Sequence, residues 1–192
     1  NYTAGPFVSR QLGALGAYVV KVEPPAGDLA RALPPHRDGQ GYFFTMSNHD
    51  KRSLMLDLRK EADKNALRDL LRDADVLVEN LRPQTLKKLQ IEYHVLAGTN
   101  PRLIHCSITG FGTHGPYKDR PAFDSVAQAT SGISSLFMSE TDPQLVGPTI
   151  SDNVTVRNCE ITNGKGNAIG IFFCWGVKFG LAEGNTLEGN RS

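Results

Sequence analysis

One carboxylate in the sequence stands where it could do covalent chemistry. The segment GPTISDN, residues 147–153, places Asp152 directly behind a short apolar run. An aspartate with an unperturbed pKa of about 3.9 is ionised at neutral pH, so it can attack a carbonyl carbon without a partner base. An aspartate followed by asparagine is also common in turns and at helix caps. The residue types alone favour the turn and leave the nucleophile open.

Polar and glycine-containing segments flank several short apolar runs. Lys51 and Arg52 come just before one run, the segment VENLRP at 78–83 leaves a second, and TGFG at 109–112 follows a third. The glycines do not form the GxGxxG pattern, so a dinucleotide fingerprint is absent. The five histidines and three cysteines show no metal-ligand spacing, and we therefore predict no metal site.

The elements that must position these segments follow an α/β pattern. Runs typical of strands are 18–22, 53–58, 75–79 and 103–108. Helical spacing of apolar residues is clearest at 6–16 and 61–72. Strands that alternate with helical crossovers predict βαβ units and a largely parallel sheet. Ligands bind such sheets beyond the carboxyl ends of the strands. The predicted ends are residues 23–27, 58–59, 80–83 and 109–112.

A different pattern follows residue 152. Residues 153–164 alternate small apolar residues with Asn and Thr, and a related run begins at Gly176, offset by 23 residues when Val154 is aligned with Val177. Self-similarity at such a period is typical of stacked β-coils. We therefore expect two domains, 1–152 and 153–192, the second resembling coils of a right-handed parallel β-helix. An irregular β-rich tail is the alternative.

The composition of the chain limits the classes of partner that it could bind. The 192 residues are 40% hydrophobic and 21% charged, with a net charge of +1, which is typical of a soluble globular protein. That balance argues against nucleic-acid and membrane partners, so an anion site must be a local pocket. An odd number of cysteines fits a reducing compartment, and we expect a cytoplasmic protein. The chain has no initiating Met, which suggests a piece that lacks its first strand.

Taken in order, these segments resemble the family III CoA-transferases, which include formyl-CoA and carnitine CoA-transferases. The motifs that carry the resemblance include AGP at 4–6, VENLRP at 78–83, GFG at 110–112 and RPAFD at 120–124. The remaining matches are residues 15–17, 20–24, 27–28, 48–53, 56–58, 75–77, 100–102, 128 and 131–132.

The resemblance implies a Rossmann-like domain that binds coenzyme A (CoA) as substrate, with Asp152 as the residue that becomes acylated. It implies CoA contacts from Thr3, Ala4, Leu56, Arg59, Asn80, Leu81, Arg82, Lys88, Arg120 and Phe123. Phosphates call for accessible Lys and Arg, and the adenine and pantetheine parts call for apolar, backbone-lined walls. The substrates would be an acyl-CoA and a carboxylic acid, and the family forms homodimers.

Three functions remain open at this point: CoA transfer through an aspartyl intermediate, CoA binding without catalysis, and carbohydrate interaction by the tail. A racemase of the same family would need a histidine base near 121–125, and the sequence PAFDS has none there. The passage from one pattern to the other near Asp152 also suggests a chimeric or truncated chain.

Overall fold

The computed structural model describes residues 3–136, 139, 141, 159–162 and 186–188. The helices are α1 (Ala4–Ala14), α2 (Tyr42–Asn48), α3 (Glu61–Asp73), α4 (Pro83–Leu89), α5 (Tyr93–Leu96), α6 (Asp124–Ser131), and the 3-10 helices η1 (Leu29–Ala32) and η2 (Ile133–Leu136). The strands are β1 (Val19–Glu23), β2 (His36–Arg37), β3 (Gln40–Gly41), β4 (Lys51–Met55), β5 (Val76–Glu79), β6 (Ile104–Ile108), β7 (Cys159–Thr162) and β8 (Thr186–Glu188).

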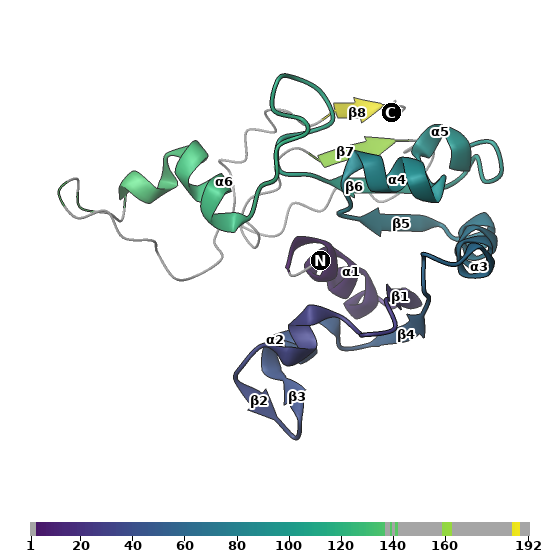
Figure 1. The fold of residues 1–192 in the computed structure, drawn as a ribbon, viewed down its shortest axis with the longest axis horizontal. Coiled ribbons are helices and arrows are strands. Elements are labelled where there is room, and N and C mark those ends of the chain that lie inside the picture. The colour runs from purple at the N-terminus through teal and green to yellow at the C-terminus, as the bar shows by residue number, and fades with distance from the viewer. Residues whose placement is uncertain (1–2, 137–138, 140, 142–158, 163–185, 189–192) are drawn as a thin grey trace.

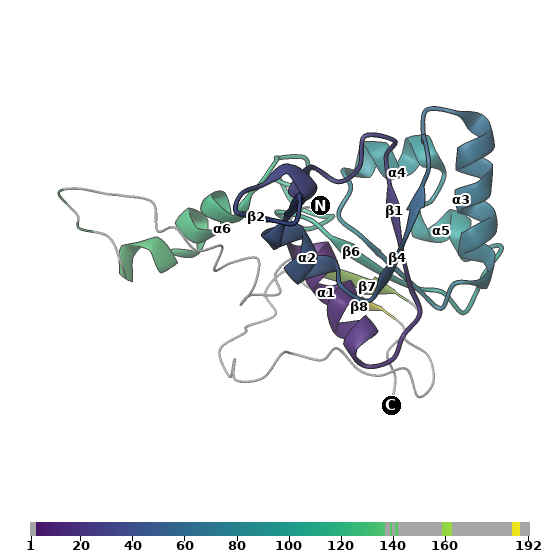
Figure 2. The same cartoon turned by 90° about the horizontal axis from the view of Figure 1, so that it is seen from below.

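Within the described residues the strands form three sheets. β1 pairs in parallel with β4, and β2 pairs with β3 as a small hairpin. The third sheet has the order β5-β6-β7-β8, in which β5 and β6 are parallel and β6 and β7 are antiparallel. Helices α3, α4 and α5 gather on one side of the molecule, whereas α6 extends away at the other (Figures 1 and 2).

A leucine-rich core joins α3 to the segment that contains α4 and α5. Leu67 and Leu71 lie four residues apart on α3, so both project from one helix face into this core. Leu103, just before β6, is fully buried. The other buried members are Leu56, Leu86, Leu89, Ile91 and Leu96. Because Leu56 follows β4 directly, the core ties the end of β4 to the helices beyond β5.

Local sequence signals explain where α3 and α4 begin and end. Glu61 and Asp63 occupy the first turn of α3, where carboxylates favour the positive end of the helix dipole. Pro83 starts α4 at a position whose missing N–H leaves no helical hydrogen bond unmade. Gln90 ends α4 in the left-handed conformation at φ 57°. Because β5 ends at Glu79 and α4 begins at Pro83, the connection between them consists of residues 80–82.

The α/β pattern predicted from the sequence is confirmed, but several element bounds are shifted. The helix predicted at 6–16 lies at Ala4–Ala14, and the strand predicted at 18–22 lies at Val19–Glu23. The strand predicted at 53–58 is Lys51–Met55, and Arg52 through Met55 are exposed rather than half-buried. The chain leaves the strand early because Asp57 begins a turn, in which its carbonyl accepts from the Lys60 N–H at 2.8 Å. Its own N–H donates to the Asp63 carboxylate at 2.7 Å, which fixes this turn against α3.

The described part of the predicted tail belongs to the same sheet as β5 and β6. β7 pairs antiparallel with β6, so the sheet is not wholly parallel, and β8 pairs in parallel with β7. The predicted domain boundary at 152 and most of the predicted β-coils lie outside the described residues. Both stay predictions.

Candidate functional site

The carboxyl end of β1 is built around a buried carboxylate. Glu23 is 4% exposed, and its two oxygens accept from the Arg31 Nε and Nη2 at 2.8 Å each. The Ser53 hydroxyl and the Asp28 N–H donate to the same carboxylate at 2.8 and 3.0 Å. These hydrogen bonds, led by that of Arg31, outweigh burial and lower the pKa of Glu23 to about 2. The guanidinium of Arg31 also stacks on the Phe44 ring at 3.8 Å.

The carboxyl end of β4 carries a second paired cation. Arg59 is exposed, and its Nε and Nη2 donate to the two oxygens of Asp57 at 2.7 and 3.0 Å. The hydrogen bonds from Arg59 lower the pKa of Asp57 to about 2. Leu56, which precedes Asp57, is only 8% exposed. A ligand could therefore contact its backbone but not its side chain.

Two cations without carboxylate partners among the described residues follow β5, Arg82 directly before α4 and Lys88 in the last turn of α4. Asn80, Arg82 and Lys88 are exposed, and within the described residues neither Arg82 nor Lys88 forms an ion pair. Leu81 lies between Asn80 and Arg82 in the sequence and packs against the core cluster that contains Leu56. The structure therefore brings the ends of β4 and β5 together through a shared apolar base, with polar and cationic side chains at its exposed rim.

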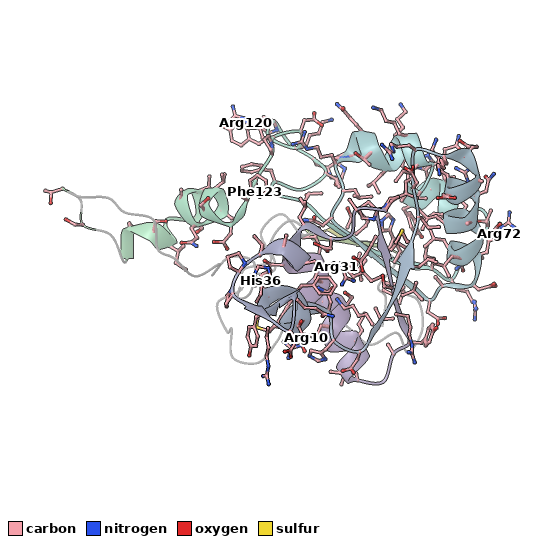
Figure 3. All side chains as sticks on the ribbon, turned by 60° about the horizontal axis from the view of Figure 1, so that its bottom comes forward. Arg10, Arg31, His36, Arg72, Arg120 and Phe123 are labelled. Atoms are coloured by element: carbon pink, nitrogen blue, oxygen red, sulfur yellow. The ribbon has the colours of Figure 1, made fainter. Side chains whose placement is uncertain are left out.

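The loop after β6 is held against its own strand end. A Cβ at Gly110 would collide with Ala122, so this glycine permits the direct contact between the two backbone segments. Arg120 stacks on Tyr117 at 4.2 Å, and Phe123 is 71% exposed at the start of α6. In Figure 3, Arg72 of α3 lies at the right-hand edge of the molecule, away from Arg120 and Phe123.

The remaining predicted site residues divide into buried, half-buried and undescribed positions. Thr3 precedes α1 and is 4% exposed, and its carbonyl accepts from the Phe7 N–H at 2.8 Å. Ala4 begins α1 and is half-buried. Asp152, the predicted nucleophile, lies outside the described residues, so its position relative to the strand ends stays a prediction.

Several functional candidates were missed by sequence reasoning. Arg31 is placed at the end of β1 by Glu23, and Glu79 at the end of β5 is buried beside His105. The sequence pattern does not indicate these pairs, because the two residues of each pair are not at a helical or strand spacing from each other. The half-buried Lys51 also went unnoticed as a structural link: its ammonium donates to the Pro6 and Ser47 carbonyls at 2.8 and 3.0 Å.

Among the described residues, no group of three His, Cys, Asp or Glu side chains is placed to hold a metal ion. No helix in the described part of the chain combines the length and apolar character that crossing a bilayer requires. The described strand ends present arginine, lysine and asparagine side chains above an apolar base, an arrangement that suits anion binding.

The chain is similar in sequence to known proteins. Residues 1–160 match the model of CoA-transferase family III, and this match extends past Asp152. Acetyl-CoA:oxalate CoA-transferase of Acetobacter aceti is 43% identical over 130 residues, which are 67% of this chain and 33% of the relative. The beta subunit of succinyl-CoA–L-malate CoA-transferase of Chloroflexus aurantiacus is 36% identical over 182 residues, 93% of this chain and 42% of the relative.

The fold is also shared with a solved structure. A CAIB/BAIF family protein from Brucella suis superposes with a TM-score of 0.74 at 37% identity, covering 80% of this chain and 42% of that one. This likeness supports the mixed α/β architecture. The chain spans about two fifths of the length of this structure and of the Chloroflexus relative, and about a third of the Acetobacter one.

Proposed function

Because the chain belongs to CoA-transferase family III, we propose that it binds CoA at the carboxyl ends of β4 and β5. One observation carries the proposal: Leu56 and Leu81 share an apolar base, and Arg59, Asn80 and Arg82 stand at its rim. CoA combines phosphate groups with an apolar pantetheine arm, so it needs cations next to an apolar wall. Lys88 on α4, and Arg120 and Phe123 after β6, extend the proposed contact surface, and Thr3 and Ala4 contribute backbone.

In the whole protein, the proposed reaction moves CoA from an acyl-CoA to a carboxylic acid. An Asp152 oxygen attacks the thioester carbonyl carbon, a mixed anhydride forms, and the CoA thiolate leaves. The thiolate then attacks the aspartyl carbonyl, which releases the first acid and leaves an aspartyl-CoA thioester. The acceptor carboxylate attacks this thioester, which expels the CoA thiolate and forms a second mixed anhydride. The thiolate then attacks the acceptor carbonyl of that anhydride, which gives the new acyl-CoA and frees the Asp152 carboxylate. The developing oxyanions need backbone N–H donors and a site that excludes water.

The binding step is tested by thermal unfolding of the 192-residue chain during titration with CoA, with inorganic phosphate as the control ligand. Ligand at about 100 times its dissociation constant stabilises a binding-competent fold by roughly 2.7 kcal/mol. We expect a saturable shift with CoA at concentrations where phosphate gives none. A cooperatively unfolding chain that CoA does not stabilise would contradict the proposal.

The covalent step needs a separate test because Asp152 lies outside the described residues. Hydroxylamine converts an acylated aspartate to a hydroxamate, which mass spectrometry locates on a peptide. We expect a hydroxamate at Asp152 in the presence of acyl-CoA, and none in Asp152→Asn. CoA binding without a hydroxamate, and without exchange of label between two acids, would instead establish a binding module.

The remaining parts of the proposal concern residues 153–192 and assembly. The parallel pairing of β7 with β8 supports stacked β-coils in the tail, and the β-helix, the chimeric origin and the carbohydrate interaction stay predictions. So do the homodimer and the cytoplasmic location. Light scattering of the purified chain would test the dimer, because a monomer at working concentration would contradict it.

A further inference from the structure

Two ionisable side chains are buried side by side on β5 and β6. Leu77 pairs with His105 across the two parallel strands, and Glu79 lies two residues further along the same strand face. The side chains of Glu79 and His105 are each 5% exposed, and His105 Nε2 lies 3.3 Å from Glu79 Oε1. The ring of Tyr93 packs on His105 with a centroid separation of 6.4 Å. Nothing in the proposed reaction uses this pair directly.

The second oxygen of Glu79 points to the segment that leaves β5. Its Oε2 accepts from the Leu81 backbone N–H at 2.6 Å. Leu81 is the middle residue of the Asn80–Leu81–Arg82 segment, and Arg82 then takes the extended conformation that precedes α4, at φ −70° and ψ 145°. One carboxylate therefore bridges β6 and the turn between β5 and α4.

This bridge restricts the turn for a physical reason. A buried carboxylate is tolerated only when hydrogen bonds replace its water, so Glu79 must keep donors on both oxygens. The Nε2–H tautomer of His105 supplies one donor, and the Leu81 N–H supplies the other. A displacement of the turn would leave the buried carboxylate without one of its two donors.

We propose that Glu79 and His105 are positioning residues, which hold the Asn80–Leu81–Arg82 segment in the conformation that contacts CoA. Glu79 acts on the Leu81 backbone, and His105 fixes the Glu79 side chain. This inference rests on the proposed function for its ligand, whereas the restraint on the turn is a property of the chain alone.

A buried hydrogen bond elsewhere provides the matched control. Asn100 is 5% exposed, and its Nδ2 donates to the Leu71 and Ala74 carbonyls at 3.1 and 2.7 Å. These bonds lie at the amino ends of β5 and β6, away from the turn before α4. Asn100→Ala removes buried side-chain hydrogen bonds to the backbone and therefore measures what destabilisation alone does to CoA affinity.

The experiment compares Glu79→Ala, Glu79→Gln, His105→Gln and Asn100→Ala in the full 192-residue chain. Amide hydrogen exchange at Leu81 reports the restraint without ligand, and calorimetric titration reports CoA affinity. We expect faster Leu81 exchange and about tenfold weaker CoA binding in Glu79→Ala, the loss that removal of one hydrogen bond to a charged group produces. Glu79→Gln keeps an acceptor for the Leu81 N–H and should retain most of both properties. His105→Gln should fall between them.

The two proposals fail in different ways. Wild-type chain that folds and does not bind CoA overturns the proposed function, while Leu81 exchange in the same samples still decides whether Glu79 restrains the turn. Folded Glu79→Ala with wild-type Leu81 exchange or wild-type CoA affinity overturns the positioning role. So does Asn100→Ala that weakens CoA binding as much as Glu79→Ala, because the effect would then come from stability alone.

Discussion

The carboxyl ends of β1 and β5 each contain a buried glutamate at the last residue of the strand, yet the two regions differ in what they leave for a ligand. Glu23 ends β1 and takes four hydrogen bonds, two of them from the guanidinium of Arg31. Glu79 ends β5 and binds a backbone N–H and a histidine, so it neutralises no arginine. Arg82, three residues later, stays exposed and without an ion pair in the described part of the chain.

The difference separates stability from binding. A carboxylate that holds an arginine fixes the fold but also offsets the positive charge that an anion would meet. A carboxylate that holds the backbone fixes the loop and leaves the neighbouring cation available. We therefore expect substitutions at the end of β1 to act mainly on unfolding, and substitutions at the end of β5 to act mainly on CoA affinity.

The largest effect is expected from Glu23→Ala. Removal of the Glu23 carboxylate leaves Arg31, the Asp28 N–H and the Ser53 hydroxyl without their shared acceptor. Buried donors that lose their acceptor destabilise the folded state strongly. Arg31 is partly exposed and can regain water, so we expect a loss of about 3 kcal/mol in the free energy of unfolding. Denaturant unfolding monitored by circular dichroism measures it. Ser53→Ala removes only one of these bonds and is the control. Equal stability of the wild-type and Glu23→Ala chains would contradict the comparison.

The pH dependence of stability should also report the hydrogen-bond network around Glu23. The pKa of Glu23 is about 2 in the folded chain and 4.5 for a free side chain, so the unfolded state binds the proton first as the pH falls. Its contribution to stability is therefore complete above about pH 4.5 and decreases as the pH falls towards 2. Glu23→Gln should flatten the decline of stability in this window, and an unchanged slope would show that other carboxylates dominate acid unfolding.

Arg82→Ala is expected to have the next largest effect, which is a loss of CoA affinity without a loss of stability. Loss of one charge-assisted hydrogen bond to a phosphate should weaken CoA binding by about tenfold, and the weakening should shrink at high salt. Because Arg82 has no carboxylate partner in the described residues, the free energy of unfolding should stay within about 0.5 kcal/mol of wild type. Arg72→Ala on α3, an exposed arginine paired with Asp69 at 2.9 Å, is the matched control and should bind CoA normally. Equal losses in both variants would indicate a nonspecific charge effect.

Sequence patterns predicted these regions to different extents. The ends of β5 and β6 could be predicted because apolar runs, prolines and glycines mark them, and the helix predicted at 61–72 is observed at Glu61–Asp73. Strand β4 was displaced because the alternation continues through Leu56 and Leu58, whereas the turn begins when Asp57 binds α3 and Arg59. Periodicity reports which residues face a core and not where a side chain stops a strand.

The buried polar pairs could not be predicted in the same way. Glu23 and Arg31 are eight positions apart, and Glu79 and His105 are 26 apart, so each pair exists only after the chain has folded. The CoA contacts came from resemblance, which transfers positions without their partners. That is why Arg59 and Arg82 looked equivalent in the sequence although one is ion-paired and the other is not.

The smallest effect should come from Arg59→Ala, because Arg59 must leave Asp57 before it can bind a phosphate. The bidentate pair lies at the surface, where water and salt screen such interactions, and its competition with the phosphate reduces the affinity that Arg59 can contribute to CoA binding. We expect CoA affinity to fall by about threefold in Arg59→Ala, less than in Arg82→Ala. Asp57→Asn sharpens the comparison, since it frees the guanidinium and should tighten CoA binding, an increase that Arg59→Ala abolishes in the double variant. If Asp57→Asn instead weakened binding, the pair would be serving to orient Arg59 towards the ligand, and the ends of β4 and β5 would bind CoA by the same means.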